Sequence, residues 1–412
     1  MPPSLETRSR KSTGANARKK IGVGLLGYAF MGKAHSNAFL QFPYIFPDSP
    51  LPILRAISGR SEGAVREAAA RYGYEKWYTD WRDLVKDPQV EVMDNGLPNY
   101  LHEQPTIEAI ELGKDVICEK PLGRDAKESE TMYQAAKKAG VKNMVGYNYR
   151  FLPAIRFARE LIQRGEIGKV IEFRAAYLQD WIMDPEFPLV WRLQKRFAGS
   201  GVLGDLGTHT IDLARFLVGD IDSVVGMTKT QIGERPILDE SNRTEGLSKL
   251  PSGDAKRDRK MGKVDVDDGF IALAKFKSGV MGSIEASRFC AGRKNFHRIE
   301  IHGLEGSLSF NLERLNELEF YSRGDSEDER GFRTISVTEP IHPYYKNWWP
   351  PGHVLGWEHA MVNEMYHYFT ALAEDRPIEP LGATFYDGMM ADRVTDAISR
   401  SNSTGRWEDA SS

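Results

Sequence analysis

A regular alternation of short apolar segments with longer amphipathic segments begins at Ile21, and it limits the possible folds more than any other feature of the sequence. The apolar segments predict strands at 21–26, 53–58, 90–93, 115–118 and 141–146. The segments between them predict helices at 31–40, 62–72, 102–112 and 126–139. Strands that alternate with helices pair in parallel and form a doubly wound α/β sheet. Right-handed crossovers then place the carboxyl ends of all the strands along one edge.

After Gly146 the pattern changes and predicts a second domain of a different class. Helices are expected at 151–164 and 206–217. Strands are expected at 170–180, 269–277, 279–288, 296–302, 306–311 and 317–321. Consecutive strands joined by short turns favour antiparallel pairing. We therefore expect an N-terminal α/β domain over residues 20–147, followed over residues 148–412 by an α+β domain with a mostly antiparallel open sheet.

Two stretches are expected to lack regular structure. Residues 1–19 are polar and basic, which is typical of a disordered tail. Residues 234–268 are dense in charge, Gly, Pro and Ser, which predicts a long, mobile surface loop.

The composition excludes several classes of protein. The 55 basic and 58 acidic side chains among 412 residues nearly cancel, which argues against nucleic-acid binding through bulk positive charge. No apolar run approaches the ~18 residues of a membrane span. The two cysteines, Cys118 and Cys290, rule out a disulfide framework. We expect a soluble, cytoplasmic protein with a packed core that binds neither a membrane nor a nucleic acid.

Two overlapping segments fit the glycine pattern G-x-G-x-x-G. The pattern that begins at Gly22 has no strand before it, and its own residues form the predicted strand, so it has no role in phosphate binding. The segment from Gly27 to Gly32 follows that strand and opens a helix, so its backbone N–H groups can face a pyrophosphate. Alanine replaces the second glycine, and its methyl group crowds that approach, so an ordinary strand–helix turn remains the alternative. The expected contacts with the dinucleotide are Gly27, Ala29, Phe30 and Met31.

The end of the second predicted strand bears on the choice between NAD and NADP. A carboxylate there would bind the ribose 2′-hydroxyl of NAD, but this chain has Ser58, Gly59 and Arg60 instead. Arg60 can pair with a 2′-phosphate, stack on the adenine or simply be solvated at the start of a helix. NAD is the expected cofactor, and NADP remains open.

Four further signatures follow one another along the chain. They are Asn95–Asn99 with His102, Ile117–Pro121, Gly146–Phe151, and Gly204–Asp212. In this order the sequence resembles the Gfo/Idh/MocA family of oxidoreductases, which includes glucose-fructose oxidoreductase and inositol dehydrogenase, over about residues 20–400. Segments 30–36, 177–181 and 198–205 are similar to the family's sugar 3-dehydrogenases, including levoglucosan dehydrogenases. The resemblance implies an N-terminal Rossmann dinucleotide-binding domain and a C-terminal domain for substrate binding and oligomerisation. It also implies an NAD(P)-dependent dehydrogenase that oxidises a ring secondary hydroxyl of a pyranose, an anhydro-sugar or an inositol.

The family resemblance places the catalytic roles on Lys120, Asp205 and His209. Hydride removal from an alcohol needs a base for the hydroxyl proton and a positive charge beside the developing alkoxide. We expect His209 to be the base and Lys120 to stabilise the alkoxide, although the proton could instead leave through Lys120. Asp205 and His209 stand at i and i+4 of a predicted helix, so the carboxylate can orient the imidazole and favour its protonated form, or bind a substrate hydroxyl. Asp212 is expected to pack or hydrogen-bond rather than ligate a metal, since no further ligand stands at matching spacing.

The remaining expected contacts come from the same resemblance and from side-chain chemistry. The further cofactor contacts are Leu97, Pro98, Asn99, His102, Glu119, Lys120 and Arg192. The substrate contacts are Lys120, Tyr149, Gln179, Trp181, Arg192, Asp205 and His209, with Arg150, Asp180 and Trp191 as additional candidates. Trp181 offers a flat face to the ring C–H bonds, and Gln179 and Arg192 can bind hydroxyls.

Two other functions fit the resemblance. One is an enzyme that cleaves glycosides through a transient 3-keto sugar without net use of the cofactor. The other is a non-catalytic regulator that senses the cofactor, although the presence of Lys120, Asp205 and His209 weighs against it. By analogy with the family, the exposed face of the second sheet predicts a homodimer or homotetramer.

Overall fold

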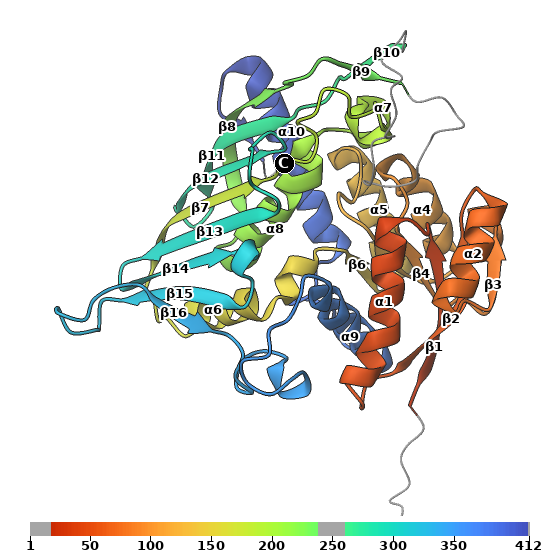
Figure 1. The fold of residues 1–412 in the computed structure, drawn as a ribbon, viewed down its shortest axis with the longest axis horizontal. Helices are drawn as coiled ribbons and strands as arrows, with labels where there is room; N and C mark the ends of the chain where they lie inside the picture. Colours follow the sequence, from red (N-terminus) through yellow and green to blue (C-terminus); the bar gives the residue numbers. More distant parts are fainter. Residues whose placement is uncertain (1–17, 238–259, 411–412) are drawn as a thin grey trace, which may run out of the picture.

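The structure is a computed structural model that describes residues 18–237 and 260–410 as two domains with a shared helical layer between their sheets (Figure 1). Most of the predicted tail (1–17) and the middle of the predicted loop (238–259) lie outside the described residues. The described end of that tail is anchored, because the Arg18 guanidinium donates to the hydroxyl of Ser49 at 2.8 Å and to the carbonyl of Pro43 at 3.2 Å.

The N-terminal domain is the predicted doubly wound sheet. Six parallel strands lie in the order β3-β2-β1-β4-β5-β6. They are β1 (Lys20–Leu26), β2 (Leu51–Ser58), β3 (Lys76–Tyr78), β4 (Val92–Asn95), β5 (Asp115–Cys118) and β6 (Asn143–Val145). The helices are α1 (Phe30–Ile45), α2 (Glu62–Tyr72), α3 (Trp81–Lys86), α4 (Glu103–Glu111) and α5 (Ala126–Ala139). The Rossmann prediction is confirmed, and the short β3 and α3 are additions to it.

The glycines of β1 and its turn have separate roles. A Cβ on Gly24 would lie 2.7 Å from Leu84 and 2.8 Å from Val90, so this strand glycine lets α3 and the turn after it pack closely. Gly27 adopts φ +92°, which only glycine adopts readily. A Cβ on Gly32 would lie 2.2 Å from the carbonyl oxygen of Gly27, so α1 packs directly on the turn. The segment from Gly27 to Gly32 therefore forms the strand–turn–helix that the second glycine match predicts.

The C-terminal domain is built on a nine-stranded sheet in the order β16-β15-β14-β13-β7-β12-β11-β8-β17. Every pair is antiparallel except β7 with β12, so the prediction of a mostly antiparallel sheet is confirmed. The strands are β7 (Val170–Leu178), β8 (Ile221–Lys229), β11 (Gly269–Phe276), β12 (Met281–Ser287), β13 (Phe296–Gly303), β14 (Gly306–Asn311), β15 (Glu317–Ser322), β16 (Arg333–Ser336) and β17 (Glu408–Asp409).

Helices cover one face of this sheet, on the side of the N-terminal domain (Figure 1). They are α6 (Pro153–Gln163), α8 (Thr208–Leu217) and α10 (Phe385–Thr404), while α7 (Lys195–Ala198) is a single turn near the cleft. Helix α9 (Glu358–Ala373) returns to the N-terminal domain and packs on α1, where the rings of Phe39 and Phe369 meet at 5.7 Å. Helix α10 similarly contacts α5. These returning helices join the two domains into one packed unit.

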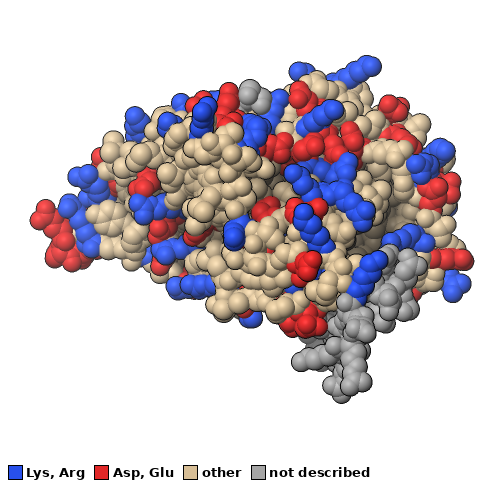
Figure 2. All heavy atoms as spheres, turned by 90° about the horizontal axis from the view of Figure 1, so that it is seen from above, with Lys and Arg blue, Asp and Glu red and all other residues tan. Residues whose placement is uncertain are grey.

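The predicted loop over 234–268 is partly ordered at its described ends. Strand β9 (Glu234–Pro236) pairs antiparallel with β10 (Met261–Lys263), which corrects the expectation of an irregular loop at both ends. The buried guanidinium of Arg235 donates to the carbonyls of Ile182 and Asp184, which ties this ribbon to the segment after β7. Basic and acidic side chains are interspersed over the face of the molecule seen in Figure 2. Among the described helices, none is long and apolar enough to cross a membrane.

Candidate active site

A cleft of about 1010 Å³ lies between the two domains, at the carboxyl ends of β1, β2, β4 and β5. Nearly all of the predicted site residues line it. From the N-terminal domain and the segment after β6 they are Gly27, Ala29, Phe30, Met31, Ser58, Gly59, Arg60, Leu97, Pro98, Asn99, Glu119, Lys120 and Tyr149. From the C-terminal domain they are Gln179, Trp181, Arg192, Asp205 and His209. The fold thus brings predicted site residues that are as far apart in the sequence as Gly27 and His209 into one cleft.

The N-terminal half of the cleft fits a dinucleotide. Helix α1 starts in the cleft with Ala29 as its N-cap, and its first turn has neither a side-chain cap nor an acidic residue. Its first backbone N–H groups are therefore available to an anion, and the helix dipole favours one there. At the end of β2, a Cβ on Gly59 would lie 2.0 Å from the ring of Tyr28, so only glycine allows that ring to cover the strand end. This arrangement can hold a pyrophosphate at α1 and a nucleoside near Arg60.

Lys120 and Asp205 meet across the domain boundary. The Lys120 ammonium donates to the backbone carbonyl of Asp205 at 2.8 Å and lies 3.2 Å from its Oδ1. The other carboxylate oxygen accepts from Arg288, whose side chain is almost completely buried, at 2.7 Å. Burial alone would raise the pKa of Asp205, but the charges of Lys120, Arg288 and Arg192 hold that pKa well below its ordinary value. Asp205 is therefore a carboxylate held between cations.

The expected contact between Asp205 and His209 is absent. Residues Leu203–Gly207 form a π-helical turn before α8, where the sequence pattern predicts an α-helix from residue 206. Its i→i+5 bonding changes the angular spacing on which an i, i+4 pair depends. The Asp205 carboxylate bonds to Lys120 and Arg288, while Nδ1 of His209 has no partner in the described part of the chain.

His209 lies buried among aromatic rings. Its imidazole is 4.5 Å from the ring of Tyr149 and 5.9 Å from that of Tyr147, measured between centroids. Burial, the charge of Lys120 and the neighbouring His297 lower its pKa well below 6.5, and these effects outweigh the opposing charge of Asp205. The charge of Asp205 does favour the protonated imidazole, as expected, but burial, Lys120 and His297 outweigh it. The lowered pKa favours the neutral imidazole, whose lone pair can accept a proton.

A buried ion cluster behind Lys120 is a feature that the sequence patterns did not reveal. His35 of α1 is fully buried, with Nδ1 2.7 Å from Asp94 and Nε2 3.0 Å from Glu119. Although burial acts the other way, these two carboxylates raise the pKa of His35 well above its ordinary value. The second oxygen of Glu119 accepts the backbone N–H of Lys120 at 3.2 Å. The cluster ties the first helix to the strand end that carries the ammonium.

His102, an expected cofactor contact, does not line the cleft. It is fully buried, and its Nδ1 lies 2.9 Å from the carbonyl oxygen of Pro121 while its Nε2 lies 2.8 Å from that of Leu97. Both ring nitrogens are thus occupied by backbone carbonyl groups, and the ring links the segments that follow β4 and β5. Its role is thus structural. Asp180 also falls outside the cleft lining, because it pairs with Lys294 at 2.8 Å and accepts the N–H of Gly292.

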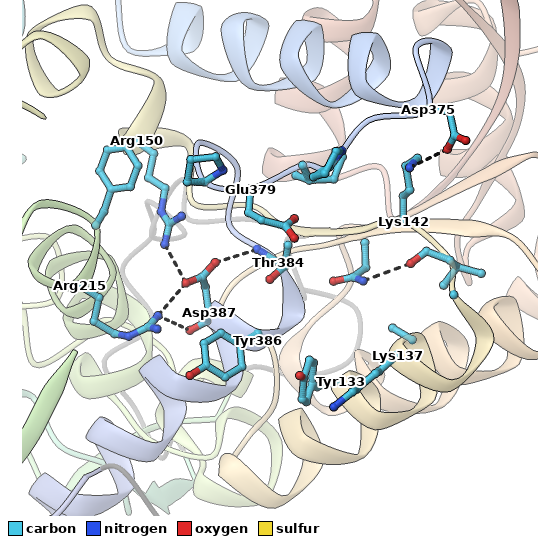
Figure 3. A pocket seen from close by; sticks show the side chains of 18 of the residues that line it. Tyr133, Lys137, Lys142, Arg150, Arg215, Asp375, Glu379, Thr384, Tyr386 and Asp387 are labelled. Carbon is cyan, nitrogen blue, oxygen red and sulfur yellow. Dashed lines mark hydrogen bonds and ion pairs between the residues drawn. The ribbon is translucent and has the colours of Figure 1, made fainter. Parts of the chain in front are cut away.

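Arg150 faces a second cavity of about 860 Å³ rather than the cleft (Figure 3). Its guanidinium forms a bidentate ion pair with Asp212. It also lies 3.4 Å from Asp387, whose carboxylate pairs with Arg215 at 2.9 Å. Asp212 therefore has the hydrogen-bonding role expected of it. No cluster of three or more His, Cys, Asp or Glu that could hold a metal occurs in residues 18–237 or 260–410.

Several residues of the cleft were not predicted. Among them are Tyr177, Asn295 and Trp357, which line the cleft. Arg288 was also not predicted, and it contacts the cleft residue Asp205 from behind the lining. Arg288 ends a predicted strand and Asn295 precedes the next, so the turn between these strands was the available signal. Trp357 lies in a segment for which no element was expected.

The doubly wound sheet, the strand–turn–helix at Gly27 and the cleft between two domains define a two-domain dinucleotide-binding α/β protein. The model of the oxidoreductase family with an NAD-binding Rossmann fold matches residues 21–147, and that of the GFO/IDH/MocA C-terminal domain matches residues 155–309. The chain belongs to the GFO/IDH/MocA oxidoreductase family, which confirms the resemblance seen in its motifs.

Individual relatives agree with this assignment. The chain is 42% identical to the levoglucosan dehydrogenase of Pseudarthrobacter phenanthrenivorans over 393 residues, covering 95% of this chain and 98% of that protein. It is 30% identical to scyllo-inositol 2-dehydrogenase (NAD⁺) of Bacillus subtilis, over 70% of this chain and 71% of that one. A solved levoglucosan dehydrogenase in complex with NADH and levoglucosan superposes with a TM-score of 0.88 at 41% identity, over 96% of this chain and 100% of that chain. The likeness to levoglucosan dehydrogenase is therefore confirmed over nearly the whole length.

Proposed function

We propose that the protein is an NAD-dependent dehydrogenase that oxidises a ring secondary hydroxyl of a pyranose or anhydro-sugar. Levoglucosan is the first substrate to test, and inositols are the next. The observation that carries this proposal is that one cleft combines the imidazole of His209 with the ion pair of Lys120 and Asp205, beside a turn suited to a dinucleotide. Relatives named for levoglucosan and inositol oxidation support the same class of substrate.

The mechanism assigns one task to each polar group. Bound NAD would accept the hydride from the carbinol carbon, which is the chemistry that the protein itself cannot supply. Neutral His209 accepts the hydroxyl proton, because its lowered pKa keeps its lone pair free at neutral pH. Lys120 donates to the oxygen as negative charge develops there. Asp205 holds the ammonium in place at 3.2 Å and can accept a bond from a second substrate hydroxyl.

The sugar pocket uses the residues of the C-terminal half of the cleft. Trp181 is held edge-on by Phe187, with ring centroids 5.3 Å apart, and it offers a flat apolar face to ring C–H bonds. Gln179 and Arg192 supply hydrogen bonds to hydroxyls from the same cleft. The assembled catalytic groups favour an enzyme over a regulator that only senses the cofactor.

We also propose a cytoplasmic homodimer or homotetramer that forms through the outer face of the nine-stranded sheet. That face exposes apolar side chains of β8, β11 and β12, namely Met227, Ile271, Leu273 and Met281. Contiguous exposed apolar side chains on one sheet face favour association. Light scattering coupled to gel filtration gives the mass, and a monomeric mass at micromolar concentration would contradict this part of the proposal.

The test uses the purified protein with NAD and NADP in separate wells and a panel of levoglucosan, pyranoses, inositols and an aryl glycoside. We expect absorbance of reduced nicotinamide with NAD and at least one ring polyol. Release of the phenol without net reduction of NAD would favour the glycoside-cleaving alternative. The His209→Gln variant should lose oxidation while still binding NADH, as followed by fluorescence. No reduction with any polyol, in protein that binds NADH, would contradict the proposal.

A further inference from the structure

A chain of hydrogen bonds crosses the floor of the cleft and ends at two amide side chains. The indole N–H of Trp357 lies 3.3 Å from the hydroxyl of Tyr149, which lies 2.8 Å from the hydroxyl of Tyr177. The Tyr177 hydroxyl is 2.8 Å from Oδ1 of Asn295, and Nε2 of Gln179 is also 2.8 Å from that oxygen. All five residues line the cleft.

The first member of this chain limits its direction. An indole N–H can only donate, so Tyr149 accepts from Trp357. In one direction, Tyr149 gives its own proton to Tyr177, and Tyr177 gives its proton to the carbonyl oxygen of Asn295. In the opposite direction, Tyr149 would receive two donors and would have to give its own proton to Asn295, with which its hydroxyl also interacts. Both phenols are almost completely buried, so each needs an acceptor within this network, and in either direction a phenol donates to the carbonyl oxygen of Asn295.

The chain therefore fixes the orientation of both amides. Oδ1 of Asn295 accepts from the Tyr177 hydroxyl and from Nε2 of Gln179. Its Nδ2 is left as a donor. Gln179 donates a hydrogen bond from Nε2 to Asn295, and its Oε1 is left as an acceptor. A donor and an acceptor stand side by side, and this pair is complementary to a hydroxyl group, which both accepts and donates.

We propose that Asn295 is a specificity-determining residue that donates from Nδ2 to one ring hydroxyl of the substrate, while Gln179 accepts the proton of a hydroxyl in the same subsite. Trp357, Tyr149 and Tyr177 act as positioning residues, because they set which end of the Asn295 amide faces the substrate. The inference rests on the proposed function, since it requires a ring polyol in the cleft. It adds the polarity of the subsite, because a ring that lacks this hydroxyl leaves the Asn295 donor and the Gln179 acceptor unpaired beneath the bound substrate.

Asn295→Asp is the decisive variant. The carboxylate still accepts from Tyr177 and Gln179, so the buried side of the network is kept, while a charged acceptor replaces the donor that faces the substrate. Two acceptors then compete for a single hydroxyl proton. We expect the affinity for the polyol, measured by calorimetry in the presence of NADH, to fall about tenfold. The matched control is Asn311→Asp outside the cleft, where the acceptor for the N–H of Glu313 is kept and binding should not change.

A series of deoxy analogues separates recognition from a general structural effect. In the wild-type protein, removal of the one ring hydroxyl that accepts from Asn295 should lower the affinity for the polyol about tenfold. In Asn295→Asp and Asn295→Ala the same removal should leave the affinity nearly unchanged. Tyr177→Phe removes one of the donors that fix the amide and should give part of the loss. Melting temperatures measured alongside report whether each variant is folded.

The outcomes distinguish this inference from the function on which it rests. If the wild-type protein binds and oxidises a polyol but Asn295→Asp binds it equally well, the role of Asn295 is overturned and the dehydrogenase remains. An undiminished deoxy effect in folded Asn295→Ala overturns it as well. If the wild-type protein with NADH binds no polyol of the panel, both the proposed function and this inference are wrong.

Discussion

Substitution of the two partners Asp205 and Arg288, singly and together, separates the stability of the site from its chemistry. Arg288 is 1% exposed and its Nη2 lies 2.7 Å from Asp205. In Asp205→Leu the guanidinium stays buried without this carboxylate, and breaking a buried pair in this way costs roughly 3–5 kcal/mol. Lys120 also loses its ion pair in this variant, but it lines the cleft, where water can solvate its ammonium.

The double variant Asp205→Leu with Arg288→Met replaces the pair by apolar groups of similar size. It should recover most of the stability lost in Asp205→Leu, so the coupling free energy in a double-mutant cycle should reach at least about 2 kcal/mol. Activity should not return, because Lys120 has lost the carboxylate that holds it, and the rate of oxidation should stay about a hundredfold low. Denaturant unfolding of the protein without cofactor gives the free energies, and reduction of NAD gives the rates. Additive free energies, or activity that recovers together with stability, would refute this account of Asp205.

Three further predictions concern the same cleft. The lowered pKa of His209 keeps this side chain unprotonated as the pH falls through 6.5, so kcat/KM for oxidation should decline only below that pH. Lys120→Met removes a charge that lowers the pKa of His209, so the acid limb of the pH profile of its residual activity should move to higher pH. A Cβ on Gly146 would lie 2.5 Å from Oε1 of Glu119, so Gly146→Ala should displace the carboxylate that holds the Lys120 backbone and lower kcat more than it lowers the melting temperature. Arg60→Ala should weaken binding of NADPH, measured by fluorescence, far more than binding of NADH, and equal losses would exclude contact of Arg60 with the 2′-position.

The sequence predicted elements whose pattern is local. The helices over 62–72 and 126–139 and the strand over 115–118 have the predicted bounds, because each shows a clear apolar period between polar ends. Helices α9 and α10 were missed for a physical reason. Both are buried on several sides, between the sheets of the two domains, so their apolar residues do not form the single stripe typical of a surface helix.

The site was predictable as a set of positions but not as a set of partners. Lys120, Asp205 and His209 do share one cleft, because parallel strand ends and the start of α8 converge there. The partner of Asp205 could not be inferred, since Arg288 lies 83 positions away and enters from the end of β12. For the same reason His102 looked like a cofactor contact, although two distant carbonyl groups occupy its ring.

The Asp205 carboxylate bonds to Lys120 and Arg288 rather than to His209, which explains how one cleft can hold both an ammonium and a neutral imidazole. A carboxylate bonded directly to His209 would favour the imidazolium, which cannot accept the hydroxyl proton. Lys120 and Arg288 draw that carboxylate away, at 3.2 Å and 2.7 Å, and the charge of Lys120 further lowers the pKa of His209. In the proposed mechanism, the ammonium that stabilises the alkoxide therefore also keeps His209 unprotonated, and Asp205 holds that ammonium in place. Substitutions at Lys120 and at His209 should accordingly be far from additive in their effects on the rate of oxidation.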